Sequence, residues 1–442
     1  MSETRNIIFL GASYAGLSAA HYFLKHVYPR LPTSPTIKYQ VILINASPKW
    51  YLRHASPRAI ADTDLMPNEK IFIDIAPGFE QYGDKVKFIV GKATSWDPEK
   101  RVLFISEPAG KETSISYHSL VLATGSKSQS AIWSSYGNGH EEIEAALADA
   151  NAQVKAAKSI VIAGGGPAGV ETAGEIAEAL NGAPGWFQSR SRNPEAQITL
   201  ITSADKLLPR LRPALAKQAE VYLNQLGVDV QYNTKVFFFA LHRSSEFESE
   251  LTLTQITSTS PASDGSTQTK VTLSNGSEIF TDLYLPALGS TPLSSYVPKH
   301  LLDAHGRVKT TESTLRVTSE AGPLVYALGD LTSFTMGGIP EIQLEVPVLA
   351  SNMQRDLLAA HSDGLSSKPK GEDRIYVPER RELQVVPVGR GGGVGAAWGW
   401  KVPSWAVWLI KGRDYMVGGA KDKVYGKPEI KEQKWQAEGQ TA

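Results

Sequence analysis

The chain carries Ile7-Ile8-Phe9-Leu10-Gly11-Ala12-Ser13-Tyr14-Ala15-Gly16 and, further along, Ile160-Val161-Ile162-Ala163-Gly164-Gly165-Gly166-Pro167-Ala168-Gly169. Each stretch is an apolar run that stops at a glycine and passes into an alanine-rich segment typical of a helix. A strand, a glycine turn and a helix in this order form a dinucleotide-binding fingerprint. Its glycines let the backbone approach a pyrophosphate, and the helix N-terminus offers free N–H groups. Two fingerprints predict two dinucleotides, most simply a flavin and a nicotinamide.

The composition excludes several classes of redox protein. The chain has no cysteine, so it has no redox disulfide, no thiolate metal site and no iron–sulfur cluster. Electrons that reach a flavin must therefore leave by another route. Lys+Arg and Asp+Glu both number 45, which gives no net charge to attract nucleic acid. We predict no metal site and no nucleic-acid partner.

The pattern of segments predicts an α/β protein. A chain of 442 residues is too long for one core and indicates two or three domains. Strand-like and helix-like segments alternate in the first half, as in a parallel sheet with crossover helices. We predict strands at 39–45, 86–90, 118–125, 198–202, 283–289 and 324–330, a helix at 139–158, a loop at 181–196 and an antiparallel meander at 244–283 that turns at Asn275-Gly276.

The first strand is expected directly after Arg5, which leaves no room for a cleaved leader. No apolar run approaches the roughly 18 residues that a membrane span needs. We therefore expect a cytoplasmic location.

Five motifs in this order resemble those of the two-dinucleotide-binding flavoproteins, the pyridine nucleotide-disulphide oxidoreductase-like family. They are the two fingerprints, Ala123-Thr124-Gly125, Leu288-Gly289 and Ala327-Leu328-Gly329-Asp330. Within this family the chain resembles the apoptosis-inducing-factor-like branch, which includes the ferroptosis-suppressor quinone reductases. The motifs for the branch are Gly164–Glu171, Val394-Gly395 and Leu409-Ile410-Lys411-Gly412-Arg413-Asp414.

The resemblance implies two Rossmann-like dinucleotide-binding domains and a C-terminal α+β cap. The FAD domain is expected to be discontinuous, with the NAD(P)H domain inserted in it. The expected bounds are 1–130 and 289–374 for the FAD domain, 131–288 for the NAD(P)H domain and 375–442 for the cap.

The resemblance also implies which residues hold FAD. Asn45 stands where an acid normally holds the adenosine ribose, and the backbone of Ala93 should contact the adenine. Arg58 matches an arginine that approaches the flavin, and Asp330 should accept a hydrogen bond from a ribityl hydroxyl. Ser13 departs from the usual glycine. The remaining expected contacts are Gly11, Ala12, Tyr14, Ala15, Gly16, Ala123, Thr124, Gly125, Gly289 and Gly329.

In the second unit, the glycines of the fingerprint are expected to cradle the pyrophosphate of NADPH or NADH. Thr202 stands where NADH-specific relatives carry an acid, and Lys206 and Arg210 follow it closely. The absent carboxylate favours NADPH or dual use, because a 2′-phosphate is not repelled. The expected contacts are Gly164, Gly166, Pro167, Ala168, Gly169 and Thr202.

Two residues are candidates for a catalytic role. Glu171 follows the last glycine of the second fingerprint, on the helix that faces the nicotinamide in relatives. His54 lies in a loop that lines the flavin face in this family, where histidine can relay a proton. Simpler readings stay open: a structural hydrogen bond for Glu171, a surface position for His54 and a helix N-cap for Asp330.

These observations predict an FAD-dependent NAD(P)H oxidoreductase that passes electrons to a small acceptor, most simply a quinone. One alternative is a reductase of an electron-carrier protein of the ferredoxin or rubredoxin type. Another is a redox-sensing interaction protein with slow turnover. Trp398, Trp400, Trp405 and Trp408 form either the core of the C-terminal cap or a docking surface that suits a membrane interface.

Overall fold

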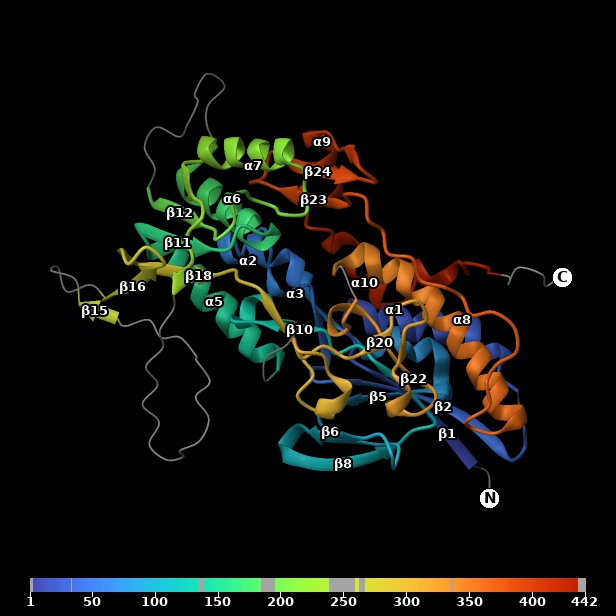
Figure 1. Cartoon of the computed structure of the whole chain (residues 1–442). Coiled ribbons are helices and arrows are strands. Elements are labelled where there is room, and N and C mark those ends of the chain that lie inside the picture. Colours follow the sequence, from blue (N-terminus) through green and yellow to red (C-terminus); the bar gives the residue numbers. More distant parts are fainter. Residues whose placement is uncertain are drawn as a thin grey trace.

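A seven-stranded sheet with the order β20-β21-β22-β9-β1-β2-β5 forms the first α/β unit of the computed structural model (Figure 1). β1 lies between β2 and β9, and all three strands are parallel. The strands are β1 (Glu3–Leu10), β2 (Ile37–Asn45), β5 (Val86–Val90), β9 (Ser119–Leu122), β20 (Thr310–Thr311), β21 (Arg316–Val317) and β22 (Val325–Ala327). The structure describes residues 3–32, 34–134, 139–183, 195–237, 259–261, 267–334 and 337–435.

Both faces of this sheet are covered, which explains the apolar, buried run Ile7–Leu10 in the second half of β1. Ile7 and Phe9 of β1 belong to the core that includes α1 (Tyr14–Tyr22) and α8 (Ile339–Asp363). Ile8 and Leu10 belong to a second core. That second core includes residues from a three-stranded sheet of β6 (Lys92–Asp97), β7 (Val102–Glu107) and β8 (Lys111–Ser116).

The second α/β unit is inserted between β9 and β20. Its four parallel strands have the order β13-β12-β11-β18, so β11 is flanked by β12 and β18 in the way that β1 is flanked by β2 and β9. Its elements are α5 (His140–Ala156), β11 (Ser159–Ala163), α6 (Pro167–Asn181), β12 (Gln197–Ile201), α7 (Pro213–Gln225), β13 (Val228–Gln231) and β18 (Leu283–Pro286).

Two short strands join the units. β10 (Ser126–Ser128) leaves the first unit and pairs antiparallel with β19 (Ser290–Pro292), which returns from the second. The first sheet therefore takes its strands from two separate stretches of the chain.

The C-terminal cap is a small α+β layer. β23 (Gln384–Pro387), β24 (Gly393–Ala397) and β25 (Trp400–Lys401) form a sheet beside α6 and α7 (Figure 1). α9 (Ser404–Val407) and a π-helical turn at Trp408–Gly412 follow, and α10 (Ala420–Val424) packs near α1 and β4 (Phe72–Asp74). β4 pairs with β3 (Lys49–Tyr51).

The four clustered tryptophans of the cap, Trp398, Trp400, Trp405 and Trp408, do not form its core. Trp400 and Trp405 are 81% and 68% exposed, and Trp398 and Trp408 are also exposed. The buried side chains of the cap's three-stranded sheet and of α9 include Val386, Val394, Ala396 and Val407, which are small and either β-branched or alanine. The reading of these tryptophans as core is therefore wrong, because short strands with small side chains fill the narrow space against α6 and α7.

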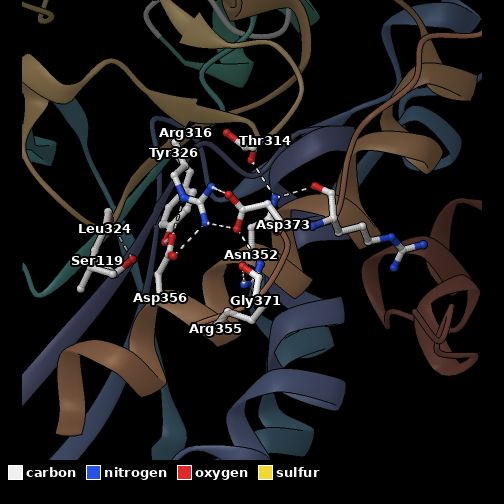
Figure 2. A network of polar contacts seen from close by, with 11 residues as sticks. Ser119, Thr314, Arg316, Leu324, Tyr326, Asn352, Arg355, Asp356, Gly371 and Asp373 are labelled. Atoms are coloured by element: carbon white, nitrogen blue, oxygen red, sulfur yellow. Dashed lines mark hydrogen bonds and ion pairs between the residues drawn. The ribbon is translucent and has the colours of Figure 1, made fainter. Parts of the chain in front are cut away.

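A buried polar network fixes α8 to the edge of the first sheet (Figure 2). Arg316 on β21 forms ion pairs with Asp356 on α8 and Asp373, at 2.7 Å each. Tyr326 on β22 donates a 2.6 Å hydrogen bond to Asp356. Asn352 of α8 adds a bond to the carbonyl of Thr314. The network thereby fixes the long helix that follows Asp330.

Most expected elements are present. The helix predicted at 139–158 is α5, and the turn at Asn275-Gly276 joins β16 (Thr267–Leu273) to β17 (Glu278–Thr281), with Gly276 at a φ of +82°. β16 also pairs antiparallel with β14 (Val236–Phe237) and β15 (Thr259–Pro261), as a meander requires. The rest of the predicted meander, and most of the loop predicted at 181–196, lie outside the described residues.

Candidate active site

The first fingerprint is a tight turn that only glycine permits at two positions. Gly11 follows β1 with a φ of +105°, and a Cβ there would lie 2.4 Å from the carbonyl oxygen of Ala123. A Cβ on Gly16, in the first turn of α1, would lie 1.7 Å from the carbonyl oxygen of Gly11. The helix therefore packs directly on the turn, with its N-terminus open to a pyrophosphate.

The second fingerprint repeats this geometry. Gly164 has a φ of +125°, and its Cβ would lie 2.2 Å from the carbonyl oxygen of Ala287. A Cβ on Gly169 would lie 1.9 Å from the carbonyl oxygen of Gly164. The close contacts are thus the same in both units, and both cradles fit a dinucleotide pyrophosphate.

Ser13 fits the fingerprint although the family usually has glycine there. Its backbone is extended, with φ −88° and ψ −165°. The matching Gly166 has φ −78° and ψ −179°, and a Cβ on it would meet no atom within 4 Å. Because neither position needs a positive φ or a missing Cβ, the departure leaves the turn intact.

A cavity opens beside the first fingerprint, at the carboxyl ends of β1 and β2. Its lining includes four of the expected FAD residues, namely Gly11, Asn45, Ala93 and Thr124. This edge of the sheet is where nucleotides bind in open α/β folds. The structure therefore brings the residues expected at the adenosine end of FAD into one cavity.

Asn45 supports the turn from the end of β2. Its Oδ1 accepts a 2.9 Å hydrogen bond from the backbone N–H of Ala12, and its Nδ2 donates to the carbonyl of Ser47 at 2.7 Å. The side chain is buried. These bonds link the two expected FAD segments through an uncharged side chain, and a ribose contact for Asn45 stays a prediction.

Asp330 lies where β22 meets the first fingerprint. Its Oδ2 accepts hydrogen bonds from Arg53 at 3.3 Å and Ser126 at 3.2 Å. The preceding Gly329 has a φ of +73°, and a Cβ there would lie 3.2 Å from the Cβ of Ala15. Asp330 is partly exposed and is not the N-cap of α8, which begins only at Ile339. A contact between Asp330 and FAD stays a prediction.

A row of glutamates on α6 faces the first unit and the cap. Glu171 pairs with Lys411 at 2.5 Å, and Glu175 pairs with Arg58 of α2 (Ser56–Ala61) at 2.7 Å. The hydroxyl of Tyr415 donates to Glu175 at 3.2 Å. The two dinucleotide units and the cap meet at these buried charges.

Burial shifts the pKa values of the two candidate catalytic residues, Glu171 and His54. It raises the pKa of the Glu171 carboxyl to about 7, although the Lys411 ammonium acts in the opposite direction. Burial also lowers the pKa of His54 to about 3, and the charge of Lys411 lowers it further. His54 is therefore neutral at pH 7, with its Nε2 buried and without a hydrogen-bond partner in the structure. A carboxyl with a pKa of about 7 can hold or release a proton near neutral pH.

The Arg58 guanidinium donates hydrogen bonds to oxygen atoms of the protein itself. Its guanidinium makes two bonds to Glu175 and one each to the carbonyls of Gly412 and Arg413. A direct contact between Arg58 and flavin stays a prediction, as does the expected contact of Gly289.

Tyr14, another residue expected to contact FAD, lies against a lysine of the cap. The Nζ of Lys423 is 4.3 Å from the centre of the Tyr14 ring.

The basic residues after Thr202 are held by carbonyl groups. Lys206 donates to Leu211 at 2.6 Å, and Arg210 donates to Gly337 at 3.1 Å. Thr202 is buried, and its Oγ1 accepts from the backbone N–H of Ala204 at 3.2 Å. A 2′-phosphate would therefore have to share these cations with the protein.

Sequence reasoning missed Lys411, Glu175 and Tyr415. Lys411 stood in a motif quoted for its resemblance, but only the fold brings it beside Glu171.

Among the described residues, no group of three or more acidic or histidine side chains is arranged to hold a metal ion. No helix among them is long and apolar enough to cross a membrane.

Comparison with known proteins agrees with this geometry. The chain belongs to the pyridine nucleotide-disulphide oxidoreductase family, whose model matches residues 5–355. It is therefore an oxidoreductase that uses FAD and a nicotinamide dinucleotide, and the expected cofactors are confirmed.

Three proteins illustrate the relationship. The chain is 43% identical to oxidoreductase phnG of Penicillium herquei over 94% of each chain. It is 23% identical to ferroptosis suppressor protein 1 of Taeniopygia guttata over 93% of each, so the resemblance to that branch is confirmed. The fold resembles that of the sulfide:quinone oxidoreductase of Aquifex aeolicus, with a TM-score of 0.65, 15% identity and coverage of 95% of this chain and 92% of that one.

Proposed function

We propose that this oxidoreductase passes the electrons of NAD(P)H through FAD to a small quinone-like acceptor. The observation that carries the proposal is the complete lack of cysteine in a family named for disulphide reduction. No disulfide of this chain can take electrons from the flavin, so an acceptor outside the chain must do so. The likeness in fold to a sulfide:quinone oxidoreductase supports a quinone as that acceptor.

The residues of the two fingerprints and of the loop before α8 suit this chemistry. The two glycine cradles would hold the pyrophosphates, and Asp330 with the α8 N-terminus would orient the flavin end. Bound FAD would supply hydride acceptance and two-electron transfer. A quinone that becomes a quinol takes up two electrons and two protons.

The Glu171–Lys411 pair is the candidate source of protons. Glu171 is buried at the junction of both units, and its pKa of about 7 allows it to hold or release a proton at neutral pH. Lys411 contributes an ammonium group 2.5 Å away. The ionised carboxylate would also favour the positive charge that develops on a nicotinamide as it loses hydride.

An acceptor panel tests the proposal. Purified protein is supplied with NADH or NADPH and either a soluble ubiquinone analogue, a ferredoxin or oxygen, and the quinol is quantified. Rapid quinol formation with slow reduction of the other acceptors is expected. Fast turnover only with the ferredoxin would establish the carrier-protein alternative, and slow turnover with every acceptor would favour the redox-sensing alternative.

We further propose a preference for NADPH. The proposal rests on Thr202 in place of an acid, because an uncharged side chain does not repel a 2′-phosphate. Thr202→Asp should lower kcat/KM for NADPH while that for NADH is kept or raised. An unchanged ratio of the two values would contradict the proposal.

Peripheral membrane contact and a cytoplasmic location also stay proposals. The contact is supported by the concentration of exposed apolar side chains in one short segment, beside Lys401 and Arg413; they are Trp398, Trp400, Trp405, Trp408, Leu409, Ile410 and Met416. Co-sedimentation with vesicles of phosphatidylcholine and phosphatidylserine should be lost in the double variant Trp400→Ser/Trp405→Ser. Equal sedimentation of variant and native protein would contradict this proposal.

A further inference from the structure

Arg58 connects three parts of the molecule through one buried guanidinium. From α2 it donates to both oxygens of Glu175 on α6, at 3.0 and 2.7 Å. It also donates to the carbonyls of Gly412 and Arg413, at 2.8 and 2.9 Å. The Arg58 side chain is 5% exposed and that of Glu175 is fully buried. Four charge-assisted bonds of this kind hold their partners in one geometry.

The pair that Arg58 forms lies one helical turn from the candidate acid–base pair. Glu171 and Glu175 are four residues apart on α6, a spacing that places two carboxylates on one helix face, where they repel each other. Lys411 neutralises the first and Arg58 the second. Each carboxylate, when ionised, therefore has a cation of its own within ion-pair distance.

Tyr415 lies between the two cations. The Cζ of Arg58 is 4.8 Å from the centre of the Tyr415 ring, and the Nζ of Lys411 is 5.5 Å from it. The Tyr415 hydroxyl donates to Glu175, which lies one helical turn from Glu171, the carboxylate that Lys411 pairs with. A lysine side chain is flexible and carries a compact charge, which allows it to change partners.

We propose that Arg58 is a positioning residue that keeps Lys411 on Glu171 by occupying Glu175. The bonds from Arg58 to the two carbonyls that follow Lys411 fix the backbone from which the lysine extends. Without Arg58, Glu175 is a buried carboxylate without a cation, and Lys411 moves to it or is shared. The inference rests on the proposed function, in which the Glu171–Lys411 pair supplies protons.

Paired variants separate this role from simple stabilisation. Arg58→Met and Glu175→Gln each break the same buried ion pair, so a merely structural role predicts similar losses in both. The proposal predicts different losses. Arg58→Met should slow quinone-dependent flavin reoxidation on the order of tenfold, whereas Glu175→Gln should keep the rate because Lys411 has no competing partner.

Two further variants make the test independent of folding defects. Arg58→Lys should retain most of the rate, since an ammonium still occupies Glu175. Arg58→Met/Glu175→Gln should recover most of the rate lost in Arg58→Met. Arg390→Met is the control, because it removes an arginine that pairs with Asp62 at 2.9 Å near the same helix but touches Glu178 only through its backbone. Its rate should be unchanged.

A crystal structure of Arg58→Met gives a readout that needs no acceptor. The proposal expects Lys411 within hydrogen-bond distance of Glu175. Lys411 still on Glu171 alone, equal rate losses in the two single variants, or no recovery in the double variant would overturn it. If the native protein reduces no quinone, the proposed function fails, and the position of Lys411 in this crystal structure still decides the inference.

Discussion

Replacement of Gly16 by alanine should separate α1 from the first fingerprint and release FAD. The added Cβ would lie 1.7 Å from the carbonyl oxygen of Gly11, so the helix must move away from the turn by more than an ångström. Overpacking of this kind costs about 3 kcal/mol or more when the obstacle is backbone. A large chain then loses roughly 5 °C or more in melting temperature.

The assay compares flavin absorbance per protein and the melting temperature of three purified proteins. Gly166→Ala is the matched control, since its Cβ would meet no atom within 4 Å and its φ of −78° suits alanine. The control should keep the flavin and the melting temperature of the native protein. Full flavin content in Gly16→Ala at an unchanged melting temperature would refute the reasoning that this contact shapes the FAD cradle.

Three further predictions concern single side chains. Asp330→Ala should lower FAD occupancy, and full retention of flavin after dialysis would show that Asp330 is not an FAD-binding residue. Burial raises the pKa of Glu171 to about 7, so the folded protein binds a proton that the unfolded chain has released, and stability from this group falls as pH rises through 7. Between pH 5 and 8 the free energy of unfolding of the native protein should therefore fall by roughly 2.5 kcal/mol relative to that of Glu171→Gln, most of it below pH 7; an identical pH dependence of the two melting temperatures would contradict this. Tyr326→Phe removes a buried bond to Asp356 and should cost about 2 kcal/mol in thermal unfolding; an unchanged melting temperature would show that the network does not stabilise the fold.

The sequence was sufficient for the framework of this protein. Where a Cβ would meet a backbone carbonyl oxygen, the chain must have glycine, and this requirement can be seen in the sequence. Both fingerprints have the two required glycines at the same spacing. Only the structure explains why Ser13 is tolerated, because this position of the turn has an extended backbone that any residue adopts. The covered half of β1 was visible in the sequence as the apolar run Ile7–Leu10.

The sequence alone did not predict the buried ion pairs between α6, α2 and the cap. Glu175 and Lys411 are far apart in the chain, and nothing local indicates that α6 and the cap share buried charges. Arg58 was recognisable as a family position, but its partners come from α6 and the segment after the π-helical turn. The tryptophans of the cap were ambiguous, because clustering in the sequence does not tell a core from a surface.

Anaerobic double-mixing stopped flow tests the central claim most directly. The protein is mixed with deuterated NADPH or NADH, flavin absorbance is followed, and a ubiquinone analogue is added in the second mix. The account predicts rapid loss of flavin absorbance, slowed by the deuterium label, and rapid return of absorbance on addition of the quinone. Flavin that is not reduced by either nucleotide, or reduced flavin that the quinone does not reoxidise, would contradict it.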